Sequence, residues 1–311
     1  MNKANPQSVW TYDLLWSKAL SYIERALAAP RDSELFPFWA SLALEFLARA
    51  ALARISPVLL AETGDSDGRH LLHAIGLEPK VKNYVPKSIT TADVITRCEQ
   101  VVPSFTKEVE SFCRGFTNRR NEELHSGSTP FCALPNDTWL PRFYETAALL
   151  LKFQGKHLVE FVGDDEAQAA EVMLRAVADE AAKSVQKQIN AHAEVWKSKK
   201  PEEQKKQGAL AQKHAQPKKG HVVICPACGS KALLTGEEIK QQPPVLENNE
   251  LVVRSIILPT NLECVACGLG IHSHSQLYAA GLGGQFTNTM TFDPLGYYAE
   301  QAYVGDEYNN E

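Results

Sequence analysis

The sequence predicts a multidomain α+β protein with an N-terminal helical bundle, a long helical and basic connection, and a C-terminal β-rich domain. Apolar residues recur at helical spacing over residues 8–163, and the pattern changes to β-type runs beyond Gly220. Two Cys-x-x-Cys pairs lie in the β-rich part. The predicted boundaries are therefore a bundle at 1–163, a long helix with a lysine-rich linker at 164–219, and a β-rich domain with a C-terminal tail at 220–311.

Composition places this chain of 311 residues in the folded globular class, because 44% of its residues are hydrophobic and 22% are charged. Asp13, Lys18 and Glu24 interrupt the apolar stretch that a signal peptide requires. The long uncharged stretch at residues 268–292 is rich in Gly, Ser, Thr, His and Asn, which makes it too polar for a membrane span. We therefore expect a cytoplasmic protein with no membrane partner.

Two long helices are predicted at the start of the bundle. The first runs from Val9 to Ala29 and stops at Pro30. The second runs from Phe38 to Ile55 and has the widest apolar face, so it is expected at the centre of the core. Glu45 and Arg49 lie one turn apart on this helix. They are expected to pair with each other, with the alternative that Glu45 points into a cleft.

A third apolar stripe follows a polar loop at residues 62–87 and ends near Gly127. Pro103 either kinks this helix or begins a new one. Pro141 is expected to open a fourth helix that reaches Phe161, so the block is predicted to be a bundle of four to five helices. The stripe has spacings of three and four residues and consists of Val101, Phe105, Val109, Phe112 and Phe116.

The segment at residues 164–219 begins as a helix and becomes strongly basic. Three acidic residues open it, and a narrow apolar stripe continues to about Trp196, which suits a helix that packs on one neighbour or on its own copy. From Lys183 to Lys219, ten lysines and three glutamates give a local charge of +7, which leaves −12 for the rest of the chain. We expect a flexible linker whose lysines contact nucleic-acid phosphates, namely Lys197, Lys199, Lys200, Lys205 and Lys206.

The C-terminal domain contains two matched Cys-x-x-Cys-Gly segments. Four thiolates on two tight turns supply the tetrahedral sulfur set that zinc prefers, and each glycine can take the positive φ that the turn needs. Because four thiolates leave no open coordination position, we predict one structural zinc per chain and no metal in catalysis. The segments, which resemble the zinc-ribbon class over about residues 222–274, are Cys225-Pro226-Ala227-Cys228-Gly229 and Cys264-Val265-Ala266-Cys267-Gly268.

Two alternatives stay open around this cluster. His272 and His274 lie close to the second cysteine pair and could replace a ligand, although alternating strand residues are the preferred interpretation. Zinc ribbons either bind nucleic acid or protein, or only stabilise a domain with a small core. The remaining cysteines are predicted to be buried or half-buried thiols without a chemical role: Cys98, Cys113 and Cys132.

The third predicted helix ends in a cluster of polar residues that includes Arg120, Asn121 and His125. On a regular helix Arg120 and His125 lie about 140° apart, so they converge only if the helix ends near His125. An imidazole can take a proton from a ribose 2′-hydroxyl, and a guanidinium can stabilise the charge that builds on phosphorus. The alternative is that these cations only cap a helix end, where the dipole favours positive charge.

These three residues resemble the Arg-x4–6-His motif of the HEPN superfamily, in which a polar residue often follows the arginine. The resemblance covers roughly residues 8–163, and Arg119, which satisfies the looser spacing, is expected to contact nucleic acid. It implies a metal-independent endoribonuclease that works as a homodimer and leaves a 2′,3′-cyclic phosphate. His125 would be the general base, Arg120 would stabilise the phosphorane, and Asn121 would orient the phosphate.

The resemblance also implies a biological setting. Many such proteins are toxins or anti-phage defence effectors that cut tRNA or mRNA, and an antitoxin or sensor protein often holds them inactive. The alternative hypothesis is a noncatalytic helical dimer whose zinc ribbon binds nucleic acid or protein as a regulator. Cleavage of RNA that persists in EDTA separates the two, because only the first hypothesis expects it.

Overall fold

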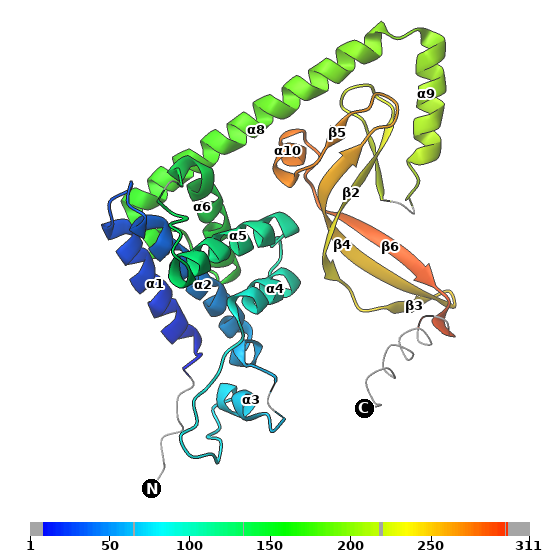
Figure 1. The fold of residues 1–311 in the computed structure, drawn as a ribbon. Helices are drawn as coiled ribbons and strands as arrows, with labels where there is room; N and C mark the ends of the chain where they lie inside the picture. The colour runs from blue at the N-terminus through cyan, green and yellow to red at the C-terminus, as the bar shows by residue number, and fades with distance from the viewer. Residues whose placement is uncertain (1–8, 65, 133, 218–219, 296, 298–311) are drawn as a thin grey trace. The chain divides into compact units, whose positions relative to one another are not determined.

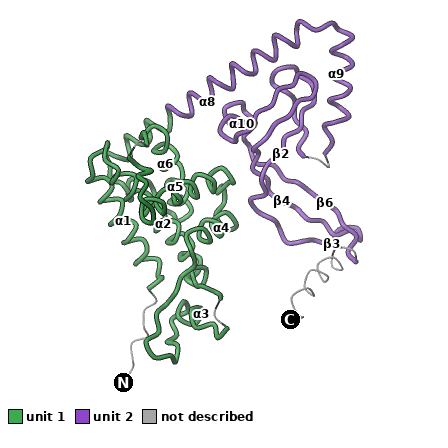
Figure 2. Tube along the Cα trace, viewed as in Figure 1, with its two compact units in different colours: residues 1–175 green, residues 176–311 purple. Residues whose placement is uncertain are grey.

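The computed structural model describes residues 9–64, 66–132, 134–217, 220–295 and 297 (Figure 1). The chain divides into two compact units, residues 1–175 and 176–311 (Figure 2). Unit 1 is helical, and unit 2 combines helices with an antiparallel sheet. The α+β class is therefore confirmed in its coarse form. The division falls at residue 175 instead of residue 163, because one long helix continues from the first unit into the second.

Unit 1 is built around α2, which is apolar on all sides and buries most of its residues. It packs on α1, α4, α5 and α6. Among the described helices, α2 is the one long and apolar enough to cross a membrane, and 67% of that apolar window is buried inside the protein. The elements of unit 1 are α1 (Tyr12–Ala28), α2 (Leu35–Ile55), η1 (Pro57–Leu60), α3 (Arg69–Ala74), α4 (Thr91–Val101), α5 (Lys107–His125), α6 (Asn136–Phe153) and α7 (Val159–Val162).

The predicted third helix is in fact two helices, α4 and α5. The turn between them contains Pro103, and Ser104 takes a φ of 67° in the left-handed region. Thr106 then caps α5, because its side chain accepts a hydrogen bond from a backbone amide of the first turn. Of the two interpretations of Pro103, the structure therefore supports a new helix start.

The predicted fourth helix begins and ends earlier than expected. Pro141 lies inside α6 and does not open it. The helix ends at Phe153 because Gly155 takes a φ of 73°, and the amides of Gly155 and Lys156 bond back to the last turn. The polar loop also contains the short helix α3, which the sequence pattern did not predict.

The lysine-rich segment is helical over most of its length, so the prediction of a flexible linker is wrong for residues 201–214. Helix α8 (Asp164–Ser198) is followed by α9 (Pro201–His214). Pro201 occupies the first turn of α9 together with two acidic residues, which is a favourable helix start. Ala211 of α9 is fully buried in the core of unit 2. The number of lysines gives the charge of this segment, but it does not show that Ala211 is buried.

Unit 2 contains a six-stranded antiparallel sheet in which β4 pairs with β2, β3, β5 and β6, and β1 pairs with β2. Val185 and Ile189 of α8 belong to the same apolar core as Leu262 and Ile271 of the sheet. Only the C-terminal half of the α8 stripe packs on the sheet, whereas Leu174 packs on the apolar core of unit 1 and Val177 is exposed. The prediction that the whole stripe packs on one neighbour is therefore wrong. The elements are β1 (His221–Ile224), β2 (Lys231–Gln241), β3 (Val245–Glu247), β4 (Glu250–Glu263), β5 (Gly270–Ile271), α10 (His274–Ala279) and β6 (Phe286–Phe292).

Candidate functional sites

Arg120 is held inside unit 1 by a buried carboxylate. Its Nη1 lies 2.8 Å from Glu45 Oε2, and the side chains of Arg120 and Glu45 are only 11% and 8% exposed. Its Nη2 donates a hydrogen bond to Thr91 Oγ1 at 3.4 Å. Among the described residues, the buried Nε of Arg120 has no hydrogen-bond partner. The guanidinium that was expected at an exposed helix end is therefore paired and largely covered.

Glu45 also binds Arg49 from the next turn of α2. The distance from Arg49 Nε to Glu45 Oε1 is 2.9 Å. Arg49 donates further hydrogen bonds to Ser88 Oγ at 3.3 Å and to the carbonyl oxygen of Ile89 at 3.2 Å. The predicted pairing within α2 is present, and Glu45 also reaches toward α5. One carboxylate is thus shared by two guanidiniums, which leaves a net charge of +1 on this cluster.

The charge state of Glu45 follows from its neighbours. Burial raises the pKa of a carboxyl group, but the positive charges of Arg49 and Arg120 and a hydrogen bond from Thr91 outweigh it, and the pKa of Glu45 lies below its ordinary value. Glu45 is therefore ionised at neutral pH. A buried ion network of this kind is destabilised strongly when one partner is removed.

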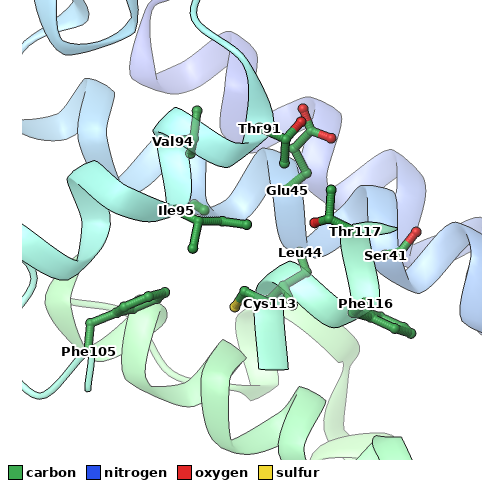
Figure 3. Close-up of a pocket in the computed structure, with 11 residues that line it drawn as sticks. Ser41, Leu44, Glu45, Thr91, Val94, Ile95, Phe105, Cys113, Phe116 and Thr117 are labelled. Atoms are coloured by element: carbon green, nitrogen blue, oxygen red, sulfur yellow. The ribbon is translucent and has the colours of Figure 1, made fainter. Parts of the chain in front are cut away.

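A small cavity lies beside Glu45 between α2, α4 and α5 (Figure 3). Glu45 and Thr91 line its polar end, and Phe105 and Ile95 line its apolar end. Its volume of about 20 Å³ has room for about one water molecule, so it does not hold an organic ligand. The cavity belongs to the packing around the ion cluster.

The free cysteines of unit 1 differ in exposure. Cys98 and Cys113 are buried, and burial raises the pKa of Cys113 to about 12 and raises that of Cys98 as well. Both are packing thiols with little thiolate at neutral pH. Cys132 is exposed, so the prediction that it is buried or half-buried is wrong. It lies in the turn between α5 and α6, next to the buried Phe131, but its own side chain is not covered.

The other residues of the motif stand on the surface of α5. Asn121, His125 and Arg119 are exposed. Helix α5 stays regular through His125, and Ser126 is its C-cap. Arg120 and His125 therefore remain about 140° apart around the helix axis, and one chain does not bring them together. The helix ends at His125, as the sequence suggested, but His125 itself still has helical geometry, so this helix end does not by itself bring the two side chains together.

The five lysines predicted to contact nucleic acid lie at the end of α8, in the junction between α8 and α9, and on α9. Lys197 pairs with Glu194 at 3.0 Å, and Lys199 pairs with Glu203 at 3.1 Å. The exposed lysines at positions 200, 205 and 206 form no ion pair with any described residue. Two of the five positive charges are therefore partly compensated. The other three remain open to solvent.

The four cysteines of the two matched segments come together in unit 2. Their sulfur atoms all lie within 4.8 Å of one another. Cys225 Sγ is 3.6 Å from Cys267 Sγ, and Cys228 Sγ is 3.5 Å from Cys264 Sγ. Four thiolates at about 2.3 Å from one zinc ion would be roughly 3.8 Å apart. The cluster can therefore hold a metal ion such as zinc, as the spacing predicted.

The two cysteine turns have the same backbone. In each, the glycine amide donates to the carbonyl of the first cysteine, at 3.0 Å for Gly229 and 2.8 Å for Gly268. Gly229 has a φ of 73° and Gly268 a φ of 76°. The hydrogen bond between Cys225 and Cys264 lowers the pKa of Cys264, which accepts it, and raises the pKa of Cys225, which donates it. A bound cation would replace the thiol protons.

Helix α8 supports the second cysteine turn through two residues that the sequence pattern did not single out. His192 Nδ1 lies 2.9 Å from the carbonyl oxygen of Cys267, and Gln188 Nε2 donates to the carbonyl oxygen of Gly270 at 2.9 Å. The one indication of this role in the sequence is spacing: His192 follows Ile189 by three residues and therefore lies on the same helix face. These contacts join the helix to the metal-binding turn.

His272 and His274 do not belong to the sulfur cluster. His272 Nδ1 lies 2.5 Å from Asn261 Oδ1, and His274 Nδ1 lies 2.9 Å from the carbonyl oxygen of Pro259. They are not alternating strand residues either, because β5 ends at Ile271 and α10 begins at His274.

No known protein-family model, curated protein or solved structure matched this chain when compared with it.

Proposed function

We propose that the chain is a metal-independent endoribonuclease of the HEPN type whose chemistry resides in the helical unit. The observation that supports this is the Glu45–Arg49–Arg120 cluster beside α5, whose outer surface carries Asn121 and His125. A buried ion network is seldom more stable than apolar packing of the same volume. Its presence is better explained by a need for positive charge at a defined place than by stability.

In the proposed reaction, His125 removes the proton from a ribose 2′-hydroxyl, whose oxygen attacks the adjacent phosphorus. The bond to the 5′-oxygen breaks, and that oxygen takes a proton from an acid, for which His125 of a second copy is the candidate. The products are a 2′,3′-cyclic phosphate and a 5′-hydroxyl. The net positive charge around Arg120 stabilises the phosphorane, and Asn121 orients the phosphate.

The site needs two copies of the chain. Arg120 and His125 of one helix point about 140° apart, so they cannot both face one phosphate unless a second α5 contributes. A homodimer with facing α5 helices supplies both groups. Binding of one substrate to two chains also predicts that activity falls on dilution below the dissociation constant of the dimer.

The cysteine cluster and the lysines have a supporting role in this proposal. A zinc ion held by the four cysteines stabilises unit 2, and the open lysines of α9 attract the RNA backbone without reading its sequence. The substrate is a tRNA or an mRNA. The biological role is that of a toxin or an anti-phage effector, which an antitoxin or sensor protein holds inactive.

The test is cleavage of cellular RNA in EDTA by the full chain. We expect His125→Ala and Arg120→Ala each to reduce cleavage by about 100-fold or more. His157→Ala is the matched control, because His157 is also an exposed histidine of unit 1. Arg120→Lys keeps a positive charge opposite Glu45, so it separates loss of chemistry from loss of folding. Equal cleavage by wild type and folded His125→Ala protein, with the same RNA ends, would refute the proposal.

A noncatalytic helical protein whose cysteine module binds nucleic acid or protein is the second candidate. The covered and paired guanidinium of Arg120 favours it, because a purely structural ion cluster has the same appearance. This candidate predicts RNA or protein binding that is unchanged in His125→Ala and lost in Cys228→Ser. It also predicts no RNA cleavage under any condition of the assay above.

A further inference from the structure

We propose that strand β6 is a self-association edge, to which a second copy of this chain adds its own β6 in antiparallel orientation. This goes beyond the ribonuclease proposal and does not depend on it. β6 pairs with β4 from Ile257↔Phe286 to Leu251↔Phe292, and no other described strand pairs with it. Figure 1 shows β6 running beside β4 on the outer side of the sheet. Within the part of the chain that the structure describes, the other side of its seven residues therefore presents backbone groups that no strand pairs.

Along the described residues of β6, this edge carries no charge, proline or bulge that would oppose pairing. Residues 286–292 contain no charged residue and no proline. The opposite edge of the sheet differs, because Pro243 and Pro244 separate β2 from β3. Natural sheets protect their edges with charges, prolines or bulges, so an edge of seven neutral residues can accept another strand.

The sequence of β6 identifies a second copy as that partner. Phe-Thr-Asn-Thr-Met-Thr-Phe is nearly symmetric about Thr289. A twofold axis at Thr289 places it opposite the same residue of the second copy, 287 opposite 291, and 286 opposite 292. Every threonine then faces a threonine and each phenylalanine faces a phenylalanine. Both kinds of cross-strand pair are favourable, and no like charges meet.

The faces of the strand determine its register. Thr287, Thr289 and Thr291 are exposed, whereas Phe286 and Phe292 are half-buried on the other face. Phe286 stacks on His221 with ring centroids 4.9 Å apart. A shift of one residue would pair the threonine face of one copy with the phenylalanine face of the other, so the twofold register at Thr289 is the one that matches.

Charge variants of the exposed threonines test the register. In Thr287→Lys/Thr291→Lys, each lysine faces a lysine of the second copy, whereas in Thr287→Lys/Thr291→Glu each lysine faces a glutamate. We expect the first variant to weaken self-association by about fivefold for each facing pair and the second to retain it. The readout is sedimentation equilibrium of the zinc-loaded chain, whose monomer mass is 34.4 kDa. A wild-type monomer at all concentrations, or equal association of both variants, overturns the proposal.

Disulfide crosslinking tests the contact itself, even if a second interface exists elsewhere on the chain. In a Cys132→Ser background, Thr289→Cys should crosslink on mild oxidation, because facing Cβ atoms are about 5 Å apart. Thr287→Cys alone should not, because its two copies lie about 14 Å apart along the strands. A mixture of Thr287→Cys and Thr291→Cys chains should crosslink. Failure of Thr289→Cys, or equal crosslinking of both single variants, overturns the proposal.

Discussion

Arg120 on α5 and Glu45 on α2 form an ion pair of 2.8 Å in the interior of unit 1, although 75 positions separate them in the sequence. The same carboxylate binds Arg49, so three charged side chains share one buried place. This ion pair determines that the two ends of the Arg-x4–6-His motif differ in exposure. The arginine is a buried, positioned charge, and the histidine is an exposed group on another side of the same helix.

Replacement of Glu45 by glutamine should destabilise unit 1 by about 3 kcal/mol, because it leaves two buried guanidiniums without their counter-charge. The free energy of unfolding in urea measures this. Glu160→Gln is the control, since Glu160 forms an exposed pair with Lys156 and should change stability by less than about 1 kcal/mol. Equal effects of the two substitutions would contradict a structural role for the buried cluster.

The stability of unit 1 should fall in acid because of Glu45. Its pKa is lower in the folded chain than in the unfolded chain, so its contribution is complete above the unfolded value of about 4.3 and is lost as the pH falls through the folded value. Urea midpoints measured from pH 6 down to pH 3 should therefore decrease more steeply for wild type than for Glu45→Gln. Parallel curves for the two proteins would argue against this assignment.

Purified protein should contain one zinc ion per chain, and Cys228→Ser should lose it. Because metal binding supplies folding free energy to such sites, the unfolding transition of unit 2 should disappear or move to much lower temperature. Unit 1 has its own apolar core and should keep its transition. Elemental analysis and calorimetry measure both effects. Cys132→Ser, which removes the exposed free thiol, should retain the metal.

Gly236→Ala should destabilise unit 2 by about 3 kcal/mol or more, because the added Cβ would lie 1.9 Å from the carbonyl oxygen of Leu258 on the neighbouring strand. Neither backbone can move without disturbing the ladder between β2 and β4. Gly127→Ala is the matched control, since nothing lies within 4 Å of its added Cβ, and it should stay within about 0.5 kcal/mol of wild type. Thermal unfolding of zinc-loaded protein separates the two.

The features predicted correctly from the sequence are those that depend on neighbouring residues. The two cysteine turns follow from a spacing of three residues and a glycine that can take a positive φ, and both appear in the structure with the same hydrogen bonds. The apolar face of α2 and the change from helix to strand near Gly220 follow in the same way from periodicity. Each of these features depends on residues that lie close together in the sequence.

Other features depended on contacts between distant segments. Periodicity did not show that Glu45 would reach Arg120, that α9 would bury Ala211, or that His192 would support the turn at Cys267. The sequence by itself determined which residues can ligate a metal and which faces are apolar. Only the tertiary structure decided which face meets which partner, because burial and pairing of side chains depend on the path of the whole chain and not on local spacing.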